Sequence, residues 1–343
     1  MKRLDGFQKG VNLGGWLSQG SLEEEHLKTF ILEDDIAKIA SWGADHVRLP
    51  VDFENIETED GAEKPEGYVY IDNCIGWCNK YGLNLVLDLH KTCGYIFDDK
   101  NYSVGFFDDE DLQNRFIALW TRLSKRYAKH SDMMMFEMLN EIVSFDVAEK
   151  WNEIALRCIR AIREQAPDVK ILYGGAGFNA VTAVKLLAEP VDENIVYNFH
   201  CYEPLLFTHQ TAWWVEDMPK DFHINYPGDL ADYLEKSQKI TGTMTGALGD
   251  KNLKITKLGT EFFEEMFKEA VEVAEKRGVS LYCGEYGVID QAPPEDTVRW
   301  FRDIHAAFLK YGIGRAVWSY KKMDFGLADE HYGNVLGELI KLL

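Results

Sequence analysis

The sequence predicts a closed barrel of eight parallel strands, each followed by a helix, on the strength of three observations. Short apolar segments alternate with amphipathic helical segments along the 343 residues, which is the pattern of a parallel sheet covered by helices. There are eight such segments, the number at which the sheet closes into a (β/α)8 TIM barrel. The competing open, doubly wound sheet begins with a glycine fingerprint, and Gly14-Gly15 lacks its spacing.

The predicted strands are short apolar runs that end in turn residues or polar residues. In chain order they cover residues 11–16, 45–50, 83–90, 133–139, 171–173, 194–200, 281–284 and 315–320. The first strand ends in the Gly14-Gly15 turn and Trp16, and we expect Trp16 to be an exposed aromatic residue. The fourth is an apolar run that ends abruptly in Asn140-Glu141, a polar pair that has no place in a core.

Apolar positions at helical spacing predict the helices between the strands. They cover residues 34–43, 70–81, 111–128, 149–165, 180–187, 260–277, 295–311 and 330–342. The first begins with acidic residues and ends at Gly43, and the second is followed by Gly82, which are common signals at helix ends.

One connection is far longer than the others. About fifty residues separate His200 from the helix at 260–277, whereas connections in α/β units usually take about 2–6 residues. The connection holds Trp213-Trp214, an amphipathic piece near 230–237 and a small polar run at 241–249. We interpret residues 208–257 as a subdomain inserted after the sixth strand on the catalytic face, and residues 1–343 as a single barrel domain.

The overall charge is strongly acidic, with 37 Lys and Arg against 57 Asp and Glu, a net charge of −20. Such a field repels nucleic acid and anionic membranes, so we expect neither as a partner. It suits a neutral substrate. We also expect the protein to be a monomer. No apolar run approaches the roughly 20 residues of a membrane span. No signal peptide follows Met1, which fits a cytoplasmic protein or a secreted one whose leader has been removed.

The six cysteines show no CxxC or Cys/His ligand pattern, so we expect buried free thiols and no metal site. No phosphate loop or flavin signature is present either. The sequence therefore predicts no cofactor.

Polar and aromatic residues recur where the predicted strands end. They are Arg48, His90, Asn140, Glu141, His200, Tyr202, Glu285 and Trp318. Taken singly, Arg48 could be the partner in a structural ion pair, and His90 and Trp318 could be ordinary residues of the hydrophobic core. Their recurrence at one edge favours an active site, because barrel enzymes carry theirs at the carboxyl ends of the strands.

The two strand-end glutamates, Glu141 and Glu285, suit the cleavage of a glycosidic bond. One carboxylic acid protonates the leaving oxygen, and one carboxylate stabilises or attacks the oxocarbenium-like centre. Different surroundings can push the two pKa values apart. Arg48 beside one of the glutamates would keep that glutamate ionised.

The ordered set of motifs resembles glycoside hydrolase family 5. The motifs are NLGGW at 12–16, HVRLP at 46–50, LDLH at 87–90, LNE at 139–141, YNFHCY at 197–202, CGEYG at 283–287 and AVW at 316–318. The Asn-Glu pair alone is weakly specific, whereas the whole series in this order is specific. The resemblance implies that Glu141 is the general acid/base and Glu285 the nucleophile, with retention of anomeric configuration.

The resemblance also implies roles for the residues around the two glutamates. Asn140 would bind the 2-hydroxyl of the sugar at the cleavage site, and His90 another hydroxyl. Tyr202 would hydrogen-bond the nucleophile, and His200 would lie near the acid/base. In the same way, Arg48 would hold Glu285 charged, and Trp318 would form the floor of the site.

Three further tryptophans are candidates for neighbouring sugar subsites, namely Trp16, Trp213 and Trp214. For the last two, a small core within the insert is an equally good explanation. The chain departs from the family at Lys91, where many relatives have a second histidine, which leaves the role of that position and the fine specificity open.

The leading hypothesis is a retaining endo-β-1,4-glucanase acting on cellulose-like or mixed-linkage β-glucan, without a cofactor. Within the same class, the substrate could be a β-mannan, a xyloglucan or a β-1,3-glucan. A carbohydrate-binding protein on an inactive barrel is a hypothesis from another class, and the presence of both glutamates argues against it. A barrel aldolase or isomerase would need a Schiff-base lysine or a phosphate site.

Overall fold

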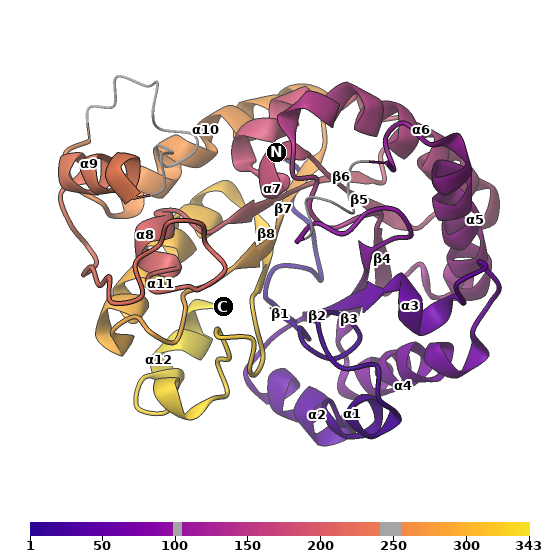
Figure 1. The fold of residues 1–343 in the computed structure, drawn as a ribbon, viewed down its shortest axis with the longest axis horizontal. Helices are drawn as coiled ribbons and strands as arrows, with labels where there is room; N and C mark the ends of the chain where they lie inside the picture. Colours follow the sequence, from indigo (N-terminus) through magenta and orange to yellow (C-terminus); the bar gives the residue numbers. More distant parts are fainter. Residues whose placement is uncertain (99–104, 241–254) are drawn as a thin grey trace.

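The computed structural model describes residues 1–98, 105–240 and 255–343. Eight parallel strands close into one barrel in sequence order, with β8 paired to β1 (Figure 1). They are β1 Gly10–Asn12, β2 His46–Asp52, β3 Asn84–Lys91, β4 Met134–Glu137, β5 Lys170–Gly174, β6 Ile195–Cys201, β7 Ser280–Tyr286 and β8 Gly314–Val317. The predicted (β/α)8 barrel is confirmed.

The helices surround the strands in Figure 1. The longer ones are α2 Glu33–Ser41, α4 Pro65–Tyr81, α5 Glu110–Tyr127, α6 Ala148–Gln165, α9 Leu230–Ile240, α10 Thr260–Arg277 and α11 Pro294–Tyr311. The shorter ones are α1 Glu24–Thr29, α3 Phe53–Ile56, α7 Ala176–Asn179, α8 Leu205–Thr208 and α12 Leu336–Leu339. Within the described part of the chain, no helix has the length and apolar character needed to cross a membrane.

Two predicted helices differ from what the structure contains. The segment at 180–187 is the 3-10 helix η3 Val181–Leu186. The segment at 330–342 is divided into η5 Glu330–Tyr332, α12 and η6 Ile340–Leu342. Gly333 and Gly337 lie within this last segment, and glycine is a poor helix former, so apolar spacing alone overestimated its length.

The barrel interior has two layers of side chains, an apolar layer and, nearer the carboxyl ends of the strands, a polar layer. Side chains of the apolar cluster are Leu4, Phe7, Val86, Met135, Leu172, Val196, Tyr282 and Ala316. Because alternate residues of a strand face the same side, β3 turns Asp88 and His90 toward the interior after Val86, and all three are buried. The polar groups therefore lie nearer the carboxyl ends of the strands.

A bulge in β7 interrupts this alternation. Phe199 of β6 pairs with Cys283, but the next residue, His200, pairs with Glu285, so Gly284 has no partner in the register. An extra residue of this kind shifts every later side chain to the opposite face. Tyr282 faces the interior, and the bulge lets Glu285 face it as well.

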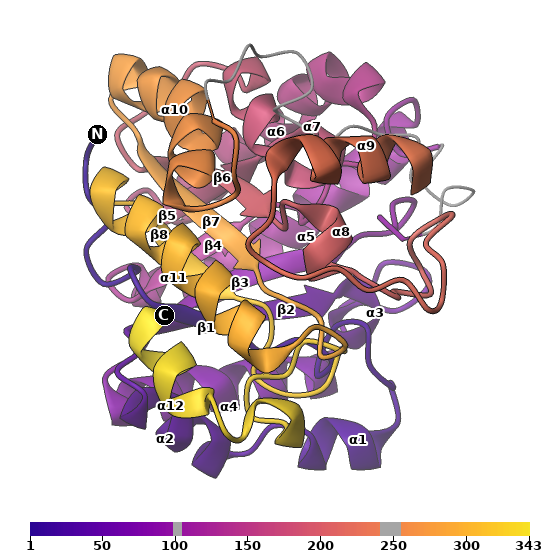
Figure 2. The same cartoon turned by 90° about the vertical axis from the view of Figure 1, so that its left-hand side faces the viewer.

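The described part of the predicted insert packs against the barrel helices. Tyr226 donates its backbone N–H to Asp296 at 3.0 Å and its hydroxyl to Asp303 at 2.9 Å, and both aspartates belong to α11. Helices α8 and α9 lie on the α10–α11 side of the barrel in both views (Figures 1 and 2). The polar run at 241–249 lies outside the described residues, and the subdomain at 208–257 stays a prediction.

Candidate active site

Arg48 of β2 lies at the centre of the polar layer, with its guanidinium fully buried. Nε and Nη2 donate to the two carboxylate oxygens of Glu137, at 2.7 and 2.9 Å. Nη1 donates to Glu285 Oε1 at 2.8 Å, and Nη2 donates to Asn140 Oδ1, also at 2.8 Å. The predicted contact between Arg48 and Glu285 is therefore present, and the arginine also fixes Asn140.

Two more carboxylates surround the same guanidinium besides Glu285. Asp88 Oδ2 lies 3.0 Å from Arg48 Nη2, and Glu137 is paired through both oxygens. Burial raises the pKa of Asp88 and that of Glu137 to about 7, against the opposing effect of Arg48. Burial disfavours a charged guanidinium too, but Asp88, Glu137 and Glu285 together hold the pKa of Arg48 above its ordinary value.

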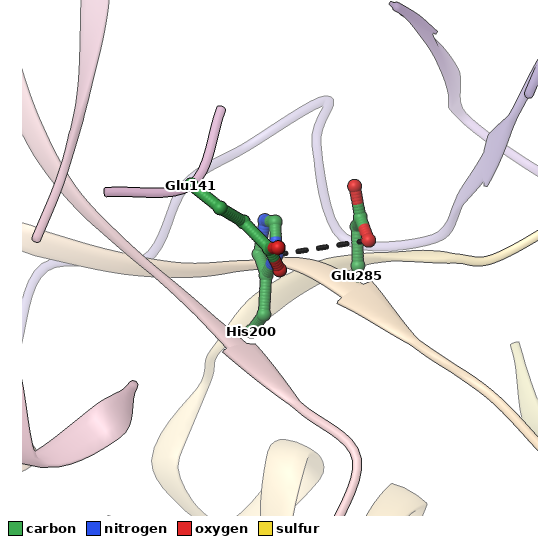
Figure 3. A group of neighbouring side chains, drawn as sticks. All are labelled: Glu141, His200 and Glu285. Carbon is green, nitrogen blue, oxygen red and sulfur yellow. Dashed lines mark hydrogen bonds and ion pairs between the residues drawn. The ribbon is translucent and has the colours of Figure 1, made fainter. Parts of the chain in front are cut away.

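Glu141, which follows β4, lies beside His200 of β6 and Glu285 of β7. Figure 3 shows the three side chains converging on one space. His200 Nδ1 lies 2.7 Å from Glu141 Oε1 and 3.7 Å from Glu285 Oε2. One atom of each side chain lies within 4.8 Å of one atom of each of the others. The two glutamates therefore face the same small volume, as the sequence predicted.

The surroundings of the two glutamates differ. Burial and the charge of Glu285 raise the pKa of Glu141 well above its ordinary value. Burial also raises the pKa of Glu285, but Arg48 and the hydroxyl of Tyr202 oppose this shift. Glu285 therefore loses its proton first, and Glu141 keeps its proton while Glu285 is charged.

His200 is uncharged in these surroundings, because burial and the nearby Arg48 hold its pKa well below the ordinary value. A neutral ring with its proton on Nδ1 donates to Glu141. Its Nε2 is buried and has no hydrogen-bond partner among the residues that the structure describes. His200 thus orients one oxygen of Glu141 and lies beside it, where the sequence placed it.

Tyr202 donates its hydroxyl to Glu285 Oε2 at 3.0 Å. Burial and the charge of Glu285 raise the pKa of Tyr202 well above its ordinary value, so the hydroxyl stays protonated and remains a donor. The ring is held edge-on by His209 at 4.9 Å between centroids. Glu285 is thereby fixed from two sides, by Arg48 and by Tyr202.

Trp318 follows β8 and stacks on His90, with ring centroids 5.8 Å apart and planes 8° apart. His90 Nδ1 lies 2.6 Å from Asp88 Oδ2, and burial lowers the pKa of His90 to about 4. A side chain on Gly14 would meet the Trp318 indole at 2.7 Å, so the glycine lets the ring approach the first loop closely. The structure thus brings His90 and Trp318 to the same end of the barrel as the glutamates.

The prediction that Trp16 is an exposed aromatic residue is wrong. Its side chain is 1% exposed. The indole N–H donates to the carbonyl of Leu27 at 2.8 Å, and the ring stacks on Trp77 with 6.1 Å between centroids. Tyr70, which like Trp77 belongs to α4, meets the ring edge-on with 6.3 Å between centroids, so the buried Trp16 offers no surface to a sugar.

Trp213 and Trp214 lie at the surface, with 80% and 41% of their area exposed, so a core within the insert does not account for them. Trp214 is edge-on to His209, with centroids 6.2 Å apart, and 6.5 Å from the ring of Phe325. Since His209 packs on Tyr202, Trp214 is connected to the catalytic end by a short series of rings. Its role as a subsite stays a prediction.

Lys91, the departure from the family pattern, lies beside His90 at the end of β3. Its ammonium is 3.8 Å from Asp52 Oδ2 and 3.5 Å from Asp98 Oδ2. Ser18 and the backbone of Gln19 also bond Asp52, at 2.6 and 3.0 Å. The lysine is therefore paired with a carboxylate at the end of β2 that is also bonded to the first loop.

Four residues of the polar layer were not among the predicted site residues: Asn12, Asp88, Glu137 and Asn198. Asn198 Nδ2 donates to Glu137 Oε1 at 2.8 Å, and Arg48 donates to Asn12 Oδ1 at 2.9 Å. A signal was present in the sequence, since each is a polar residue within or at the end of a largely apolar strand. Buried polar groups in such places need partners. Here Arg48 is the partner of Asn12, Asp88 and Glu137, and Asn198 bonds Glu137.

Glu141, His200 and Glu285 are close enough to offer ligands to a metal ion. However, His200 Nδ1 already bonds Glu141, and Glu285 is paired with the Arg48 cation. A divalent cation would break the first contact and lie close to the guanidinium. These contacts account for the cluster as it stands, and the expectation of no metal site stays a prediction.

A barrel with two buried, facing glutamates of unequal pKa at the carboxyl ends of its strands has the equipment of a glycoside hydrolase. The family model described as Cellulase (glycosyl hydrolase family 5) matches residues 5–324. The chain belongs to glycosyl hydrolase family 5, the family that the sequence motifs indicated, and it is a glycoside hydrolase.

Similar proteins agree with this assignment. Cellodextrinase A of Ruminococcus flavefaciens is 43% identical over 315 residues, which are 92% of this chain and 86% of that protein. Endoglucanase C of Acetivibrio thermocellus is 42% identical over 344 residues, 98% of each chain. The solved structure of Thermotoga maritima Cel5A in complex with cellobiose has a TM-score of 0.75 at 24% identity, over 98% of this chain and 97% of that one.

Proposed function

We propose that the chain is a retaining endo-β-1,4-glucanase that hydrolyses cellulose-like or mixed-linkage β-glucans through a covalent intermediate. The observation that carries the retaining mechanism is the approach of Glu141 and Glu285, which have oxygens within 4.8 Å of one another. Retaining glycosidases hold their carboxyl groups about 5–5.5 Å apart, whereas inverting enzymes leave about 6.5–9.5 Å for a water molecule.

In the first step, the Glu285 carboxylate attacks the anomeric carbon and the glycosidic C–O bond breaks. Glu141 gives its proton to the leaving oxygen in the same step. In the second step, Glu141, now ionised, takes a proton from water as the water oxygen attacks the anomeric carbon and releases Glu285. The raised pKa of Glu141 and the contact between Arg48 and Glu285 both support this division of roles.

The neighbouring side chains are suited to hold the sugar at the cleavage site. Because Arg48 occupies Asn140 Oδ1, the amide nitrogen of Asn140 is left to donate to the 2-hydroxyl. His90 is suited to bind a second hydroxyl. The indole of Trp318 is suited to support the ring from below. Trp213 and Trp214 are exposed and suited to more distant sugars.

The choice of a β-1,4-glucan rests on the relatives. One of them is named a cellodextrinase and others are named endoglucanases. Product profiles on carboxymethylcellulose, lichenan, glucomannan and laminarin test this choice. Preferred cleavage of glucomannan or laminarin would replace the β-glucan assignment with a β-mannanase or a β-1,3-glucanase on the same scaffold.

The mechanism is tested with Glu285→Ala and an aryl β-cellobioside. Hydrolysis is expected to disappear, because no group remains to form the glycosyl ester. Added azide is expected to restore turnover and to give a glycosyl azide of inverted configuration, since the small anion attacks from the vacated face. Activity like that of the wild type, without azide, would rule out Glu285 as the nucleophile.

A further inference from the structure

A buried hydrogen bond crosses the interior of the barrel at the level of the apolar layer, and the reaction described above does not use it. His46 Nε2, on β2, lies 2.6 Å from the hydroxyl oxygen of Tyr282, on β7. Both side chains are 0% exposed, and their ring centroids are 5.6 Å apart. Two apolar side chains would fill the same space without polar groups that must be satisfied. The polar pair therefore calls for an explanation beyond packing.

Asp45 sets the direction of this bond. Its Oδ1 lies 2.6 Å from His46 Nδ1. The same carboxylate accepts from the backbone N–H groups of Gln8 at 2.8 Å and Lys9 at 2.9 Å. Burial alone would raise the pKa of Asp45, but its hydrogen bonds, first among them the one with His46, hold that pKa below its ordinary value. Because a carboxylate only accepts, Nδ1 carries the proton, and Nε2 accepts from the Tyr282 hydroxyl.

The two strands between these residues carry glycine where the bond passes. In the closed order of the sheet, β8 and β1 lie between β7 and β2. Gly10 of β1 pairs with His46, and Gly314 of β8 pairs with Tyr282. A Cβ on Gly10 would lie 2.1 Å from His46 Nε2, and one on Gly314 would lie 3.1 Å from the Tyr282 ring. Each partner thus reaches over a strand that has no side chain at that level.

The same two strands supply the contact that holds the nucleophile candidate. Arg48 lies two residues after His46 on β2, and alternate residues of a strand face the same side. Glu285 follows Tyr282 on β7, beyond the bulge at Gly284. Arg48 Nη1 donates to Glu285 Oε1 at 2.8 Å. Strands β2 and β7 are therefore connected across the interior at two levels, and the bond between His46 and Tyr282 is nearer their amino ends.

We propose that His46 and Tyr282 are positioning residues for the nucleophile. Their hydrogen bond fixes β7 against β2 just before the bulge, so that Glu285 leaves the bulge within reach of Arg48. At the bulge, β7 shifts its register against both of its neighbours, β6 and β8, and the ladder there constrains the strand less than regular pairing would. The bond between the two side chains supplies a constraint that the ladder lacks. The inference rests on the proposed function, in which Glu285 is the nucleophile.

A double-mutant cycle tests this role. Tyr282→Phe removes the hydroxyl and keeps the ring, and His46→Phe removes the acceptor and keeps an aromatic ring. The double variant leaves no unpaired polar atom between the rings, so it is expected to fold even where a single variant is unstable. Tyr173→Phe is the matched control, since Tyr173 is a buried tyrosine of β5 whose hydroxyl bonds Asn152 of α6.

The measurements are kcat, KM and the pH dependence of kcat/KM on an aryl β-cellobioside, with the melting temperature of each variant. In both single variants kcat is expected to fall roughly 3- to 20-fold with KM within about twofold, because a displacement of less than about 1 Å at a reacting group lowers the rate more than binding. A weaker contact with Arg48 raises the pKa of Glu285, which must be ionised to attack. The acidic limb of kcat/KM is therefore expected to move upward by roughly 0.3–1 pH unit.

The double variant is expected to differ little from either single variant, since all three lack the same bond. The control is expected to lose stability and to keep its kcat and its acidic limb. The charged and titratable groups that face Glu285 are unchanged in every variant: Arg48, Asp88, His90, Glu141, His200 and Tyr202. A shift of the limb therefore reports a change in their arrangement and not the loss of one of them.

Three outcomes would overturn the positioning role. Lower melting temperatures with unchanged kcat and acidic limb would mean that the pair only stabilises the fold. Shifts that add in the double variant would mean that His46 and Tyr282 act separately, and an equal shift in Tyr173→Phe would mean that any loss of stability moves the limb. Failure of the proposed function is recognised separately, since Glu285→Ala would then stay active without azide.

Discussion

The backbone N–H of Gly284 donates to the side-chain oxygen of Asn198 at 3.0 Å, and this bond anchors the bulge that turns the nucleophile candidate into the barrel. On the other side, the Gly284 carbonyl accepts from Asn12 Nδ2 at 2.9 Å. The backbone of the unpaired residue of β7 is thus satisfied by two side chains, one from the neighbouring strand β6 and one from β1. Without the bulge, strict alternation from Tyr282 would direct Glu285 away from Arg48.

Gly284→Ala is expected to displace the bulge. A Cβ at this position would lie 2.9 Å from both Asn198 Oδ1 and His200 Nε2, closer than real contacts allow. We expect kcat to fall roughly 10- to 100-fold, because a displacement of about 1 Å at a reacting group can cost that much. Gly337→Ala is the control, since a Cβ there meets no atom of the described part of the chain within 4 Å. A variant with unchanged kcat would show that the bulge does not set the position of Glu285.

Glu141→Gln is expected to separate substrates by the quality of their leaving groups. The glutamine keeps the size of the side chain and its contact with His200, but it has no acidic proton to give. We expect kcat/KM to fall by roughly 10² to 10⁴ for cello-oligosaccharides, which need the proton, and far less for a dinitrophenyl β-cellobioside, which does not. Equal losses on the two substrates would exclude Glu141 as the acid.

Tyr202→Phe is expected to move the acidic limb of the pH–activity profile. The hydroxyl of Tyr202 lowers the pKa of Glu285 by donating to its charged form, so removing it raises that pKa. Glu285 must be ionised to attack, and the acidic limb of kcat/KM should therefore shift upward by roughly 0.5–1 pH unit. The basic limb, which reports Glu141, should move less. A downward shift of the acidic limb would contradict the assigned hydrogen bond.

The number of strands and the positions of their ends were predictable, because a buried strand is an apolar run and the residues that follow it are polar. Glu141 and Glu285 could be placed in this way, since each stands where an apolar run stops, whereas Arg48 lies inside β2. The bulge at Gly284 could not be predicted, because it depends on hydrogen bonds from Asn12 and Asn198, which are distant in sequence. The prediction that Trp16 is exposed failed for the same reason. Trp77, on which Trp16 stacks, lies 61 positions further along the chain.

Arg48→Lys is expected to lower both activity and stability. Lysine cannot form the forked contact with Glu137 or reach Glu285 and Asn140 at the same time. Leaving buried carboxylates without their partner costs about 3–5 kcal/mol in the free energy of unfolding. We expect urea unfolding to show a loss of that size and kcat to fall more than roughly 100-fold.

Arg315→Lys serves as the control for Arg48, because Arg315 is also a buried arginine but pairs with the Leu343 carbonyl and His305. Its replacement is expected to reduce stability and to leave kcat near the wild-type value. If Arg48→Lys and Arg315→Lys had the same effect on kcat, the loss would reflect general destabilisation and not the geometry of the site.

Glu137→Gln is expected to change how stability depends on pH. Burial raises the pKa of Glu137 in the folded protein to about 7, above its value of 4.5 in a solvated chain. Between these values the folded protein holds the proton more tightly, so the stability that this group contributes is present at low pH and lost as the pH rises through about 7. Glutamine cannot titrate. The free energy of unfolding of the wild type minus that of Glu137→Gln should therefore decrease by about 2–3 kcal/mol between pH 4.5 and 7.5.

Urea unfolding of both proteins at pH 5, 6, 7 and 8 measures this difference. Taking the difference matters because the lowered pKa values of His90 and His200 act in the opposite direction, stabilising the folded state as the pH rises toward 6.5. Both histidines are present in the two proteins, so their contributions largely cancel. A difference that rises with pH, or that does not change, would mean that Arg48 keeps Glu137 ionised throughout this range. In that case the guanidinium would outweigh burial at the centre of the site.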